Sequence, residues 1–342
     1  FNMWFHYQPV RQEYQYQAEH CPPRIRFADV SDIQDSAPQA PVEVFSNRAE
    51  KLWQRATALA QLNSNSDTLI SYWDKCDGEP LPFIVSTDDT RHIQVVPRDV
   101  LDPLSNKRRL SEALCERNLA AIAPRTFDRA VDALAYAEGV EKPWFVKNSF
   151  ATTGKDVYCV TTEDLSVIEL EENYVVQEGI TDLALIDGKK FVTRIYLLCW
   201  RKQLFLSNKA LCEVHGALYE CDSTDYDVQI NHSDYADKGS AVELIALHDS
   251  EHESKIMRRA AKLCRLLKPL LSDLLTATDE NYYAILGLDV LLESCGDLKL
   301  IEIDSFPDFI HTEHINSHVN VPLLAAVLNL MTSPEHKNFE VL

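Results

Sequence analysis

Two neighbouring apolar segments near the end of the chain constrain its fold more than any other feature. They read AILGLDVLLES (residues 284–294) and LKLIEIDSF (residues 298–306), with a short turn between them. Each segment is typical of a buried strand, yet Asp289 lies in the first, and Glu302 and Asp304 lie in the second. Side chains two residues apart on a strand point to the same face. The pattern therefore predicts an antiparallel hairpin that brings three carboxylates together.

These carboxylates need a cation, because burying one carboxylate is unfavourable and burying several side by side is worse. Ligands that are all oxygen suit a hard divalent ion, and Mg²⁺ bound together with phosphate groups is the usual case. The sequence therefore predicts a Mg²⁺ site at Asp289, Glu302 and Asp304. The alternative is that Asp289 and Asp304 only end their strands at the solvent.

A second group of residues is suited to hold a polyphosphate. Lys147 ends the apolar segment PWFVK, and it is followed by Asn148, Ser149 and the segment TTGK at residues 152–155. A lysine beside exposed backbone N–H groups is a sound arrangement for binding phosphates. The segment has few glycines and is not a Walker A loop, so a hairpin that carries a surface lysine is the alternative.

Three further segments place polar residues in apolar surroundings. YVVQEGI at residues 174–180 predicts a strand that runs into Glu178–Gly179, where backbone groups at a sheet edge can meet an adenine ring. KKFVTRIYLL alternates apolar residues with Lys190 and Arg194, and Asn231 lies in DVQINHSDY beside a short apolar flank. With the carboxylates, these residues indicate a nucleotide-binding site.

Composition excludes some partners. The chain has 342 residues and a formal net charge of -20, spread along its length, which repels nucleic acid and anionic membrane surfaces. Its nine cysteines are scattered and form no CxxC motif, as expected of free thiols in a reducing compartment. No apolar stretch is long enough to span a bilayer and no signal-peptide pattern opens the chain, so we expect a cytoplasmic protein.

The hydrophobic periodicity predicts a mixture of helices and strands. Helices are expected at residues 48–62, at 105–119 with Ser105 as N-cap, at 256–274 with a kink at Pro269, and at 320–331. Strands are expected at residues 82–89, and then in five segments between residues 143 and 214. The leucine-rich helix at 256–274 is interpreted as core packing rather than a partner-binding stripe.

The order of these pieces resembles the ATP-grasp superfamily and, within it, the tubulin tyrosine ligase-like branch. The matching segments, all between residues 100 and 310, are FVKNS, VVQEGI, GKKFVTRIYLL, QINH, AILGLDVLL and LIEIDSFP. The resemblance implies an α+β, ATP-grasp fold in which two α+β lobes grip ATP, preceded by an N-terminal α/β domain. The implied division is an N-terminal domain at 1–100, a central lobe at 101–178 and a C-terminal lobe with the metal site at 179–342.

The resemblance also implies roles for individual residues. ATP would lie between the lobes with Mg²⁺ on Asp289, Glu302 and Asp304, and Arg194 would neutralise the γ-phosphate or an acyl phosphate. The residues implied to bind ATP are Lys147, Thr153, Gly154, Lys155, Gln177, Glu178, Gly179, Ile180 and Lys209, and those implied to be catalytic are Arg194, Asn231 and Lys190. The family reaction joins a carboxylate to an amine through an acyl phosphate. The implied substrates are a protein, peptide or small-molecule carboxylate and an amino-acid amine donor.

The chain departs from the family pattern at several positions. Val192 stands where an acidic residue is expected, and Asp304 stands where the last metal ligand is usually Asn. The glycine loop reads GKDV at residues 154–157, so its second glycine is missing. These departures keep a rival open, a nucleotide-dependent chaperone or scaffold without turnover. A ligase for free small molecules is a third possibility. Because net charge -20 opposes long-range attraction to acidic tubulin tails, the acceptor stays open.

One histidine cluster follows the metal-binding segment. His311, His314 and His318 are spaced as on one helix face, with Glu313 among them. Such clusters are more often a solvated face or helix caps than a transition-metal site, so metal binding here is the weaker interpretation.

Overall fold

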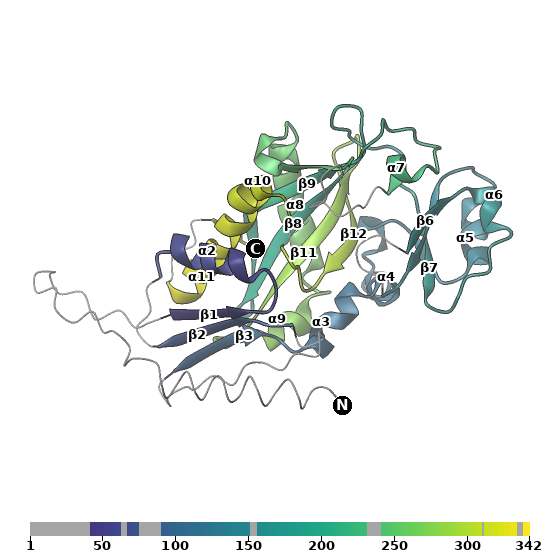
Figure 1. Cartoon of the computed structure of the whole chain (residues 1–342). Helices are drawn as coiled ribbons and strands as arrows, with labels where there is room; N and C mark the ends of the chain where they lie inside the picture. The colour runs from purple at the N-terminus through teal and green to yellow at the C-terminus, as the bar shows by residue number, and fades with distance from the viewer. Residues whose placement is uncertain are drawn as a thin grey trace, which may run out of the picture.

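The computed structural model describes residues 42–62, 67–74, 90–150, 156–230, 241–309, 311–333 and 338–342. Within these residues the chain forms a large sheet of nine strands and a small sheet of four. Figure 1 shows the two sheets as separate bodies, with α3 (Arg98–Ser105) and α4 (Lys107–Glu116) near their junction. The strand expected at residues 82–89 lies outside the described residues.

The large sheet has the order β1-β2-β3-β11-β8-β9-β10, with β12 added on β11 and β13 added on β9. Its strands are β1 (Val42–Ser46), β2 (Thr68–Tyr72), β3 (Arg91–Val95), β8 (Phe191–Trp200), β9 (Gln203–Val214), β10 (Glu243–Ala246), β11 (Tyr282–Leu292), β12 (Leu298–Asp304) and β13 (Phe339–Val341). β11 and β12 pair antiparallel, which confirms the predicted hairpin. β3 pairs in parallel with the start of β11.

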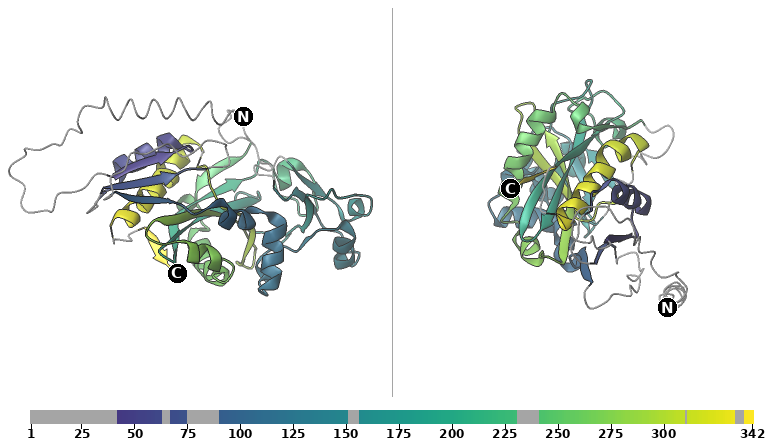
Figure 2. Two further views of the ribbon diagram at one scale, coloured as in Figure 1. Left: turned by 90° about the horizontal axis from the view of Figure 1, so that it is seen from below. Right: turned by 90° about the vertical axis from the view of Figure 1, so that its left-hand side faces the viewer.

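Helices cover both faces of this sheet. α2 (Glu50–Leu59) and α11 (Val321–Thr332) lie together on one face, and α8 (Glu253–Leu267) with α9 (Ser272–Ala277) lies on the other (Figure 2). The single kinked helix expected at residues 256–274 is wrong, because the helix ends before Pro269, which cannot donate a helical hydrogen bond. Ile256, Leu263 and Leu267 of α8 are buried in the core, as predicted, whereas Leu266 is exposed.

The helix expected at residues 105–119 is present as α4, but its predicted cap is wrong. Ser105 ends the preceding helix α3, and the side chain of Asn106 accepts a hydrogen bond from the Arg109 backbone N–H at 3.0 Å instead. Asparagine is as good an N-cap as serine, so the sequence offers two adjacent candidates. This cap makes Lys107 the first residue of α4, and the Lys107 side chain lines the cleft described below.

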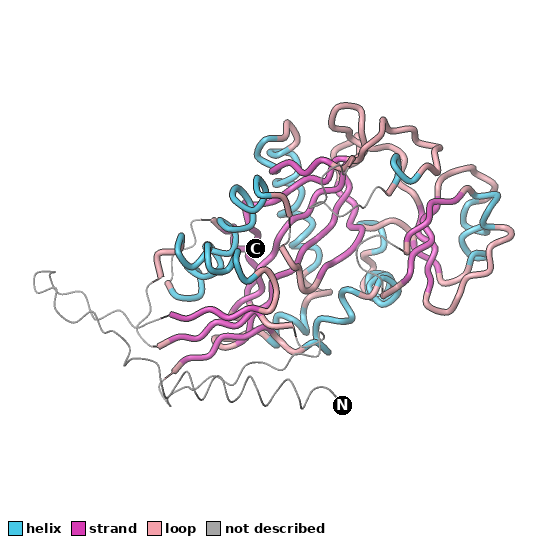
Figure 3. The backbone as a smooth tube through the Cα atoms, in the orientation of Figure 1, coloured by secondary structure: helices cyan, strands magenta, loops and turns pink. Residues whose placement is uncertain are grey.

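The small sheet has the order β4-β7-β5-β6, and Figure 3 shows it with its two helices beyond the large sheet. Its elements are β4 (Thr126–Phe127), α5 (Ala130–Ala137), β5 (Trp144–Asn148), β6 (Val157–Val160), α6 (Thr162–Leu165) and β7 (Tyr174–Glu178). On β5, Trp144 and Val146 point into a core with Leu165 and Val176. Phe145 and Lys147 therefore face the opposite side, because side chains alternate along a strand.

The described part of the first hundred residues is continuous with the large sheet. β1, β2 and β3 pair in parallel with one another, and β3 then joins β11. Tyr72 of β2 is fully buried and stacks on Phe306, whose ring lies 4.4 Å away, just after β12. The exact division into domains at residues 100 and 178 stays a prediction.

Two expectations from composition concern cysteines and membranes. Cys115, Cys159, Cys199, Cys212, Cys221, Cys264 and Cys295 carry free thiols. In the part of the chain that the structure describes, every helix is too short or too polar to cross a bilayer.

Candidate active site

A cleft separates the small sheet from the large sheet. It encloses about 870 Å³ of empty space, part of it open to solvent. Its lining is Lys107, Pro124, Phe145, Lys147, Val157, Gln177, Glu178, Ile180, Lys190, Val192, Glu213, His215, Gln229, Ile230, Asp289, Leu291, Ile301 and Glu302. The cleft thus brings together residues that are up to 195 positions apart in the sequence, from Lys107 on α4 to Glu302 on β12.

Lys147 and Gln177 come from neighbouring strands of the small sheet. The Lys147 ammonium group is buried and donates a hydrogen bond to Gln177 Oε1 at 2.7 Å. Its Nζ also lies 5.5 Å from the centre of the Phe145 ring. Burial lowers the pKa of Lys147 to about 8, so this cation is held in the protein at an energetic cost that an anion in the cleft would offset.

Lys190 approaches the same ring from the large sheet, just before β8 begins. Its ammonium group lies 4.7 Å from the Phe145 ring centre and donates to both the backbone oxygen and Oε1 of Gln229, at 2.9 and 3.0 Å. Burial lowers the pKa of Lys190 to about 7. Two buried lysines that share one aromatic ring make this end of the cleft a site for anionic groups.

The segment after β7 crosses from the small sheet to the large one. Glu178 pairs with Lys142 at 2.6 Å, and the Gly179 backbone N–H donates to the Pro143 oxygen at 2.9 Å. A Cβ atom at position 179 would lie 2.5 Å from that oxygen, so only glycine fits there. Glu178 and Ile180 both line the cleft.

Two of the three predicted carboxylates, Asp289 and Glu302, line the floor of the cleft, and Asp304 lies outside its lining. Asp289 and Glu302 are direct partners across β11 and β12, and Asp304 pairs with Gly287. A register shift after Asp289 marks a bulge in this ladder. Bulges locally bend a strand and re-aim its side chains, and this one lies beside the carboxylates.

Arg194 joins two of these carboxylates. Its side chain hydrogen-bonds both oxygens of Asp289, with Nη2 at 2.9 Å from Oδ2, and its Nη1 lies 3.2 Å from Asp304 Oδ2. The guanidinium crosses over Gly287, where a Cβ atom would lie 2.7 Å from Arg194 Cδ. The glycine in GLDVLL is therefore the residue that makes room for Arg194.

The charges in this cluster interact strongly. Burial raises the pKa of Asp289 above its usual value, although Arg194 opposes the change. Burial also acts to raise the pKa of Glu302, but Lys107, Lys147 and Arg194 together outweigh it and hold that pKa low. Lys107 Nζ lies 3.3 Å from Glu302 Oε2. The two carboxylates on the floor of the cleft therefore differ: burial raises the pKa of Asp289, whereas the neighbouring cations hold the pKa of Glu302 low.

The donor set suits a hard cation, because Asp289, Glu302 and Asp304 offer only carboxylate oxygens and two of them are adjacent. In the described residues, however, no group of three acidic, histidine or cysteine side chains is already arranged around one metal position. Instead, Arg194 donates hydrogen bonds to both Asp289 and Asp304. The residues fit Mg²⁺ in chemistry, and Arg194 provides the compensating charge in this structure.

The remaining predicted residues are distributed as follows. Thr153, Gly154, Lys155 and Asn231 lie outside the described residues. Lys209 lies on β9, and it does not belong to the residues that line the cleft. Its binding role stays a prediction.

Four polar residues of the cleft were not among the predicted site residues, and these are Lys107, Glu213, His215 and Gln229. Lys107 follows a helix cap, and Glu213 is the partner of Val192 across β8 and β9. Glu213 thus places an acidic group beside the position where the family pattern expects one and this chain has valine. Strand pairing is the signal that would have found it, since cross-strand partners share a face.

The histidines of the predicted cluster diverge. His311 is half-buried and its Nδ1 lies 2.8 Å from the Asn320 amide nitrogen, whereas His314 and His318 lie on the surface with ring centres 4.3 Å apart. His318 Nδ1 contacts the His314 backbone oxygen at 2.8 Å. The exposed positions of His314 and His318 fit a solvated face, whereas His311 packs against Asn320.

Comparison with known proteins links this geometry to one family. The model of the tubulin-tyrosine ligase family matches residues 103–212 and 241–339. A probable tubulin–tyrosine ligase of Schizosaccharomyces pombe is similar to this chain, with 26% identity over 180 residues. The alignment covers 49% of this chain, and 44% of that protein's own length. The family match includes Lys147, Arg194, Asp289 and Glu302, but leaves out the segment around Gln229 and Asn231.

Proposed function

From the premise that this chain belongs to the tubulin-tyrosine ligase family, and so to the ATP-grasp superfamily, we propose that it is an ATP-dependent carboxylate–amine ligase. In the proposed reaction, a carboxylate of a protein or peptide takes the γ-phosphoryl group of ATP and becomes an acyl phosphate. The amine of an amino acid then attacks the acyl carbon and releases phosphate. The products are ADP, phosphate and a new amide bond.

The observation that carries this proposal is the arrangement of opposite charges across one cleft. Lys147 from the small sheet and Lys190 from the large sheet are buried in the lining of the cleft, and Asp289 and Glu302 line the same cleft. A triphosphate bound between them would be neutralised by lysines on one side and by a metal ion on the other. Phosphoryl transfer depends mainly on such positioning and charge neutralisation, so no side-chain nucleophile is required.

Each group has a defined part in the proposal. The backbone of residues 177–180 would contact the adenine, and Lys147 and Lys190 would bind phosphate oxygens. Asp289, Glu302 and Asp304 would hold Mg²⁺, which would supply a Lewis acid to the phosphate oxygens. Arg194, already at the same carboxylates, would stabilise negative charge on the transferred group.

A second candidate function is a nucleotide-dependent scaffold without turnover. The ion pairs of Arg194 with Asp289 and Asp304 favour it, because they satisfy the carboxylates without a metal. The two functions differ in one measurable property. A ligase couples ATP consumption to its other substrates, whereas a scaffold binds ATP without such coupling.

ADP release is the experiment that separates them. The full chain would be supplied with Mg·ATP, mixed amino acids and carboxylate peptides, including acidic and tubulin-derived ones. The proposal expects ADP formation that requires both a carboxylate and an amine, together with a mass increase of the peptide. Tight ATP binding with no stimulation by any pair would favour the scaffold, and turnover with amino acids alone would favour a small-molecule ligase.

A further inference from the structure

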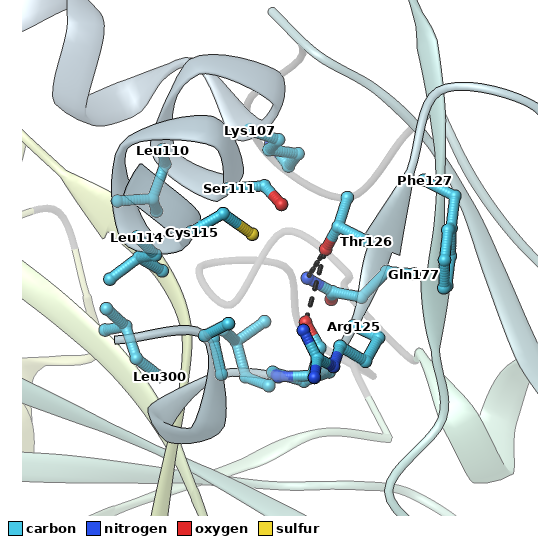
Figure 4. Close-up of a pocket in the computed structure, with 14 residues that line it drawn as sticks. Lys107, Leu110, Ser111, Leu114, Cys115, Arg125, Thr126, Phe127, Gln177 and Leu300 are labelled. Carbon is cyan, nitrogen blue, oxygen red and sulfur yellow. Dashed lines mark hydrogen bonds between the residues drawn. The ribbon is translucent and has the colours of Figure 1, made fainter. Parts of the chain in front are cut away.

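A second cavity adjoins the cleft, and Gln177 is one of the residues that line both. Both cavities are lined by Gln177, Lys107, Pro124 and Ile301. The second cavity is otherwise lined mainly by apolar residues of α4 and the segment before β4, including Leu110 and Leu114 (Figure 4). Gln177 lies on β7, which pairs with the two-residue strand β4 on one side and with β5 on the other.

A chain of three hydrogen bonds runs through Gln177. Lys147 Nζ donates to Gln177 Oε1 at 2.7 Å, and Gln177 Nε2 donates to Thr126 Oγ1 at 3.2 Å. The Thr126 hydroxyl in turn donates to the Pro124 backbone oxygen at 3.3 Å. Figure 4 shows the Thr126 hydroxyl pointing at the Gln177 amide. In this series of hydrogen bonds, each donor therefore has one defined acceptor.

The direction matters because a glutamine amide has two unlike ends. Oε1 accepts a hydrogen bond from the lysine, whereas Nε2 would confront the ammonium group with another donor. The Thr126 hydroxyl uses its proton on Pro124, so its oxygen is available only as an acceptor. It therefore favours the amide orientation that turns Oε1 toward Lys147. Thr126 and Gln177 are direct partners across β4 and β7, which fixes their separation.

We infer that Thr126 is a positioning residue for nucleotide binding, because it orients Gln177 so that Gln177 holds Lys147 toward the phosphates. The inference rests on the proposed function, in which Lys147 contacts the triphosphate. Thr126 itself lines the second cavity and not the cleft, so it acts through Gln177 and not on the nucleotide. Its neighbour Phe127 packs on Trp144 and carries the structural role of β4, with ring centres 6.1 Å apart.

The test compares Thr126→Val, which keeps the side-chain shape but removes the hydroxyl, with Thr126→Ser, which keeps the hydroxyl. Binding of a non-hydrolysable ATP analogue and of adenosine would be measured on the full chain by calorimetry and by competition. We expect the valine variant to bind the ATP analogue roughly three- to tenfold more weakly, as for loss of one supporting hydrogen bond. Adenosine, which lacks phosphates, should bind unchanged, and the serine variant should restore the wild-type affinity.

A double-mutant cycle with Lys147→Met gives the decisive readout. If Thr126 acts only through Lys147, the valine substitution should have no further effect on binding of the ATP analogue once Lys147 is gone. Equal loss of adenosine and analogue affinity, or an undiminished effect without Lys147, would overturn the inference and assign Thr126 a structural role. A wild-type chain that binds no ATP analogue would instead contradict the proposed function, so the two failures are distinguishable.

Discussion

At the scale of single residues, the site depends on where one arginine and one glycine meet. Arg194 lies between Asp289 and Asp304, and Gly287 leaves the space that its side chain crosses. The sequence predicted the three charged residues, because charged side chains in apolar strands have a high desolvation cost. It did not predict that Arg194 would take the place expected for the metal, since that depends on distances between three strands.

Substitution of Gly287 tests this arrangement. Gly287→Ala places a methyl group 2.7 Å from Arg194 Cδ, so the guanidinium must move. We expect ligase turnover to fall on the order of 10²-fold, as when a group that stabilises transition-state charge is displaced. Steady-state ADP release measures the loss. In an Arg194→Ala background the same substitution should have little further effect, and an equal second loss would contradict the role given to Gly287.

The two buried lysines make a prediction about pH. Burial lowers the pKa of Lys190 to about 7 and that of Lys147 to about 8, and a bound triphosphate favours their charged forms. Nucleotide binding should therefore take up protons near pH 8, where the phosphates are already ionised, and affinity should fall from pH 7 to pH 9. Calorimetry in buffers of different ionisation enthalpy measures the uptake.

Lys190→Met is the control for the pH experiment. This variant should bind the nucleotide more weakly and take up fewer protons at pH 8 than the wild type. An affinity that rises with pH, or binding without any proton uptake, would show that the lysines do not meet the phosphates.

At the scale of elements, alternation along β5 divides its residues between fold and function. Trp144 is fully buried and its indole N–H donates to Thr162 Oγ1 at 3.1 Å, whereas Phe145 faces the cleft. The run PWFVK predicted the strand and the role of Lys147. It did not predict that both Lys147 and Lys190 would contact the Phe145 ring, because Lys190 comes from the other sheet.

Substitutions at neighbouring positions of β5 should therefore affect different properties, which are protein stability at Trp144 and ATP binding at Phe145. Trp144→Ala should destabilise the protein by about 3–5 kcal/mol, as expected for a large cavity. Phe145→Leu should cost less than about 1.5 kcal/mol but weaken ATP binding, because the lysines lose their shared ring. Urea unfolding and nucleotide titration measure the two quantities. A Phe145 variant with normal ATP affinity would exclude the ring from the phosphate site.

At the scale of the whole molecule, two sheets far apart in sequence build one cleft. Local patterns predicted β5, β7, β8, β11 and β12, and their order indicated the family, because each strand carries its own apolar run and polar residue. The placement of β1–β3 on the same large sheet was not predicted, since parallel pairing of distant strands leaves no local pattern. Lys107 was not predicted to belong to the site for the same reason, because its ion pair with Glu302 joins α4 to β12.

The central claim is that this cleft uses Mg·ATP to activate a carboxylate, and Glu302→Gln tests it most directly. The measurement is Mg²⁺-dependent ADP release with carboxylate and amine present, compared with Glu293→Gln, a partly exposed acidic residue of the same hairpin that pairs with Lys299 at 3.8 Å. Loss of a ligand charge for Mg²⁺ should lower turnover on the order of 10²-fold or more in the first variant and leave the second near wild type. Both variants would be assayed at a temperature where an unfolding curve shows that they are folded. Turnover by Glu302→Gln equal to that of the wild type would contradict the account.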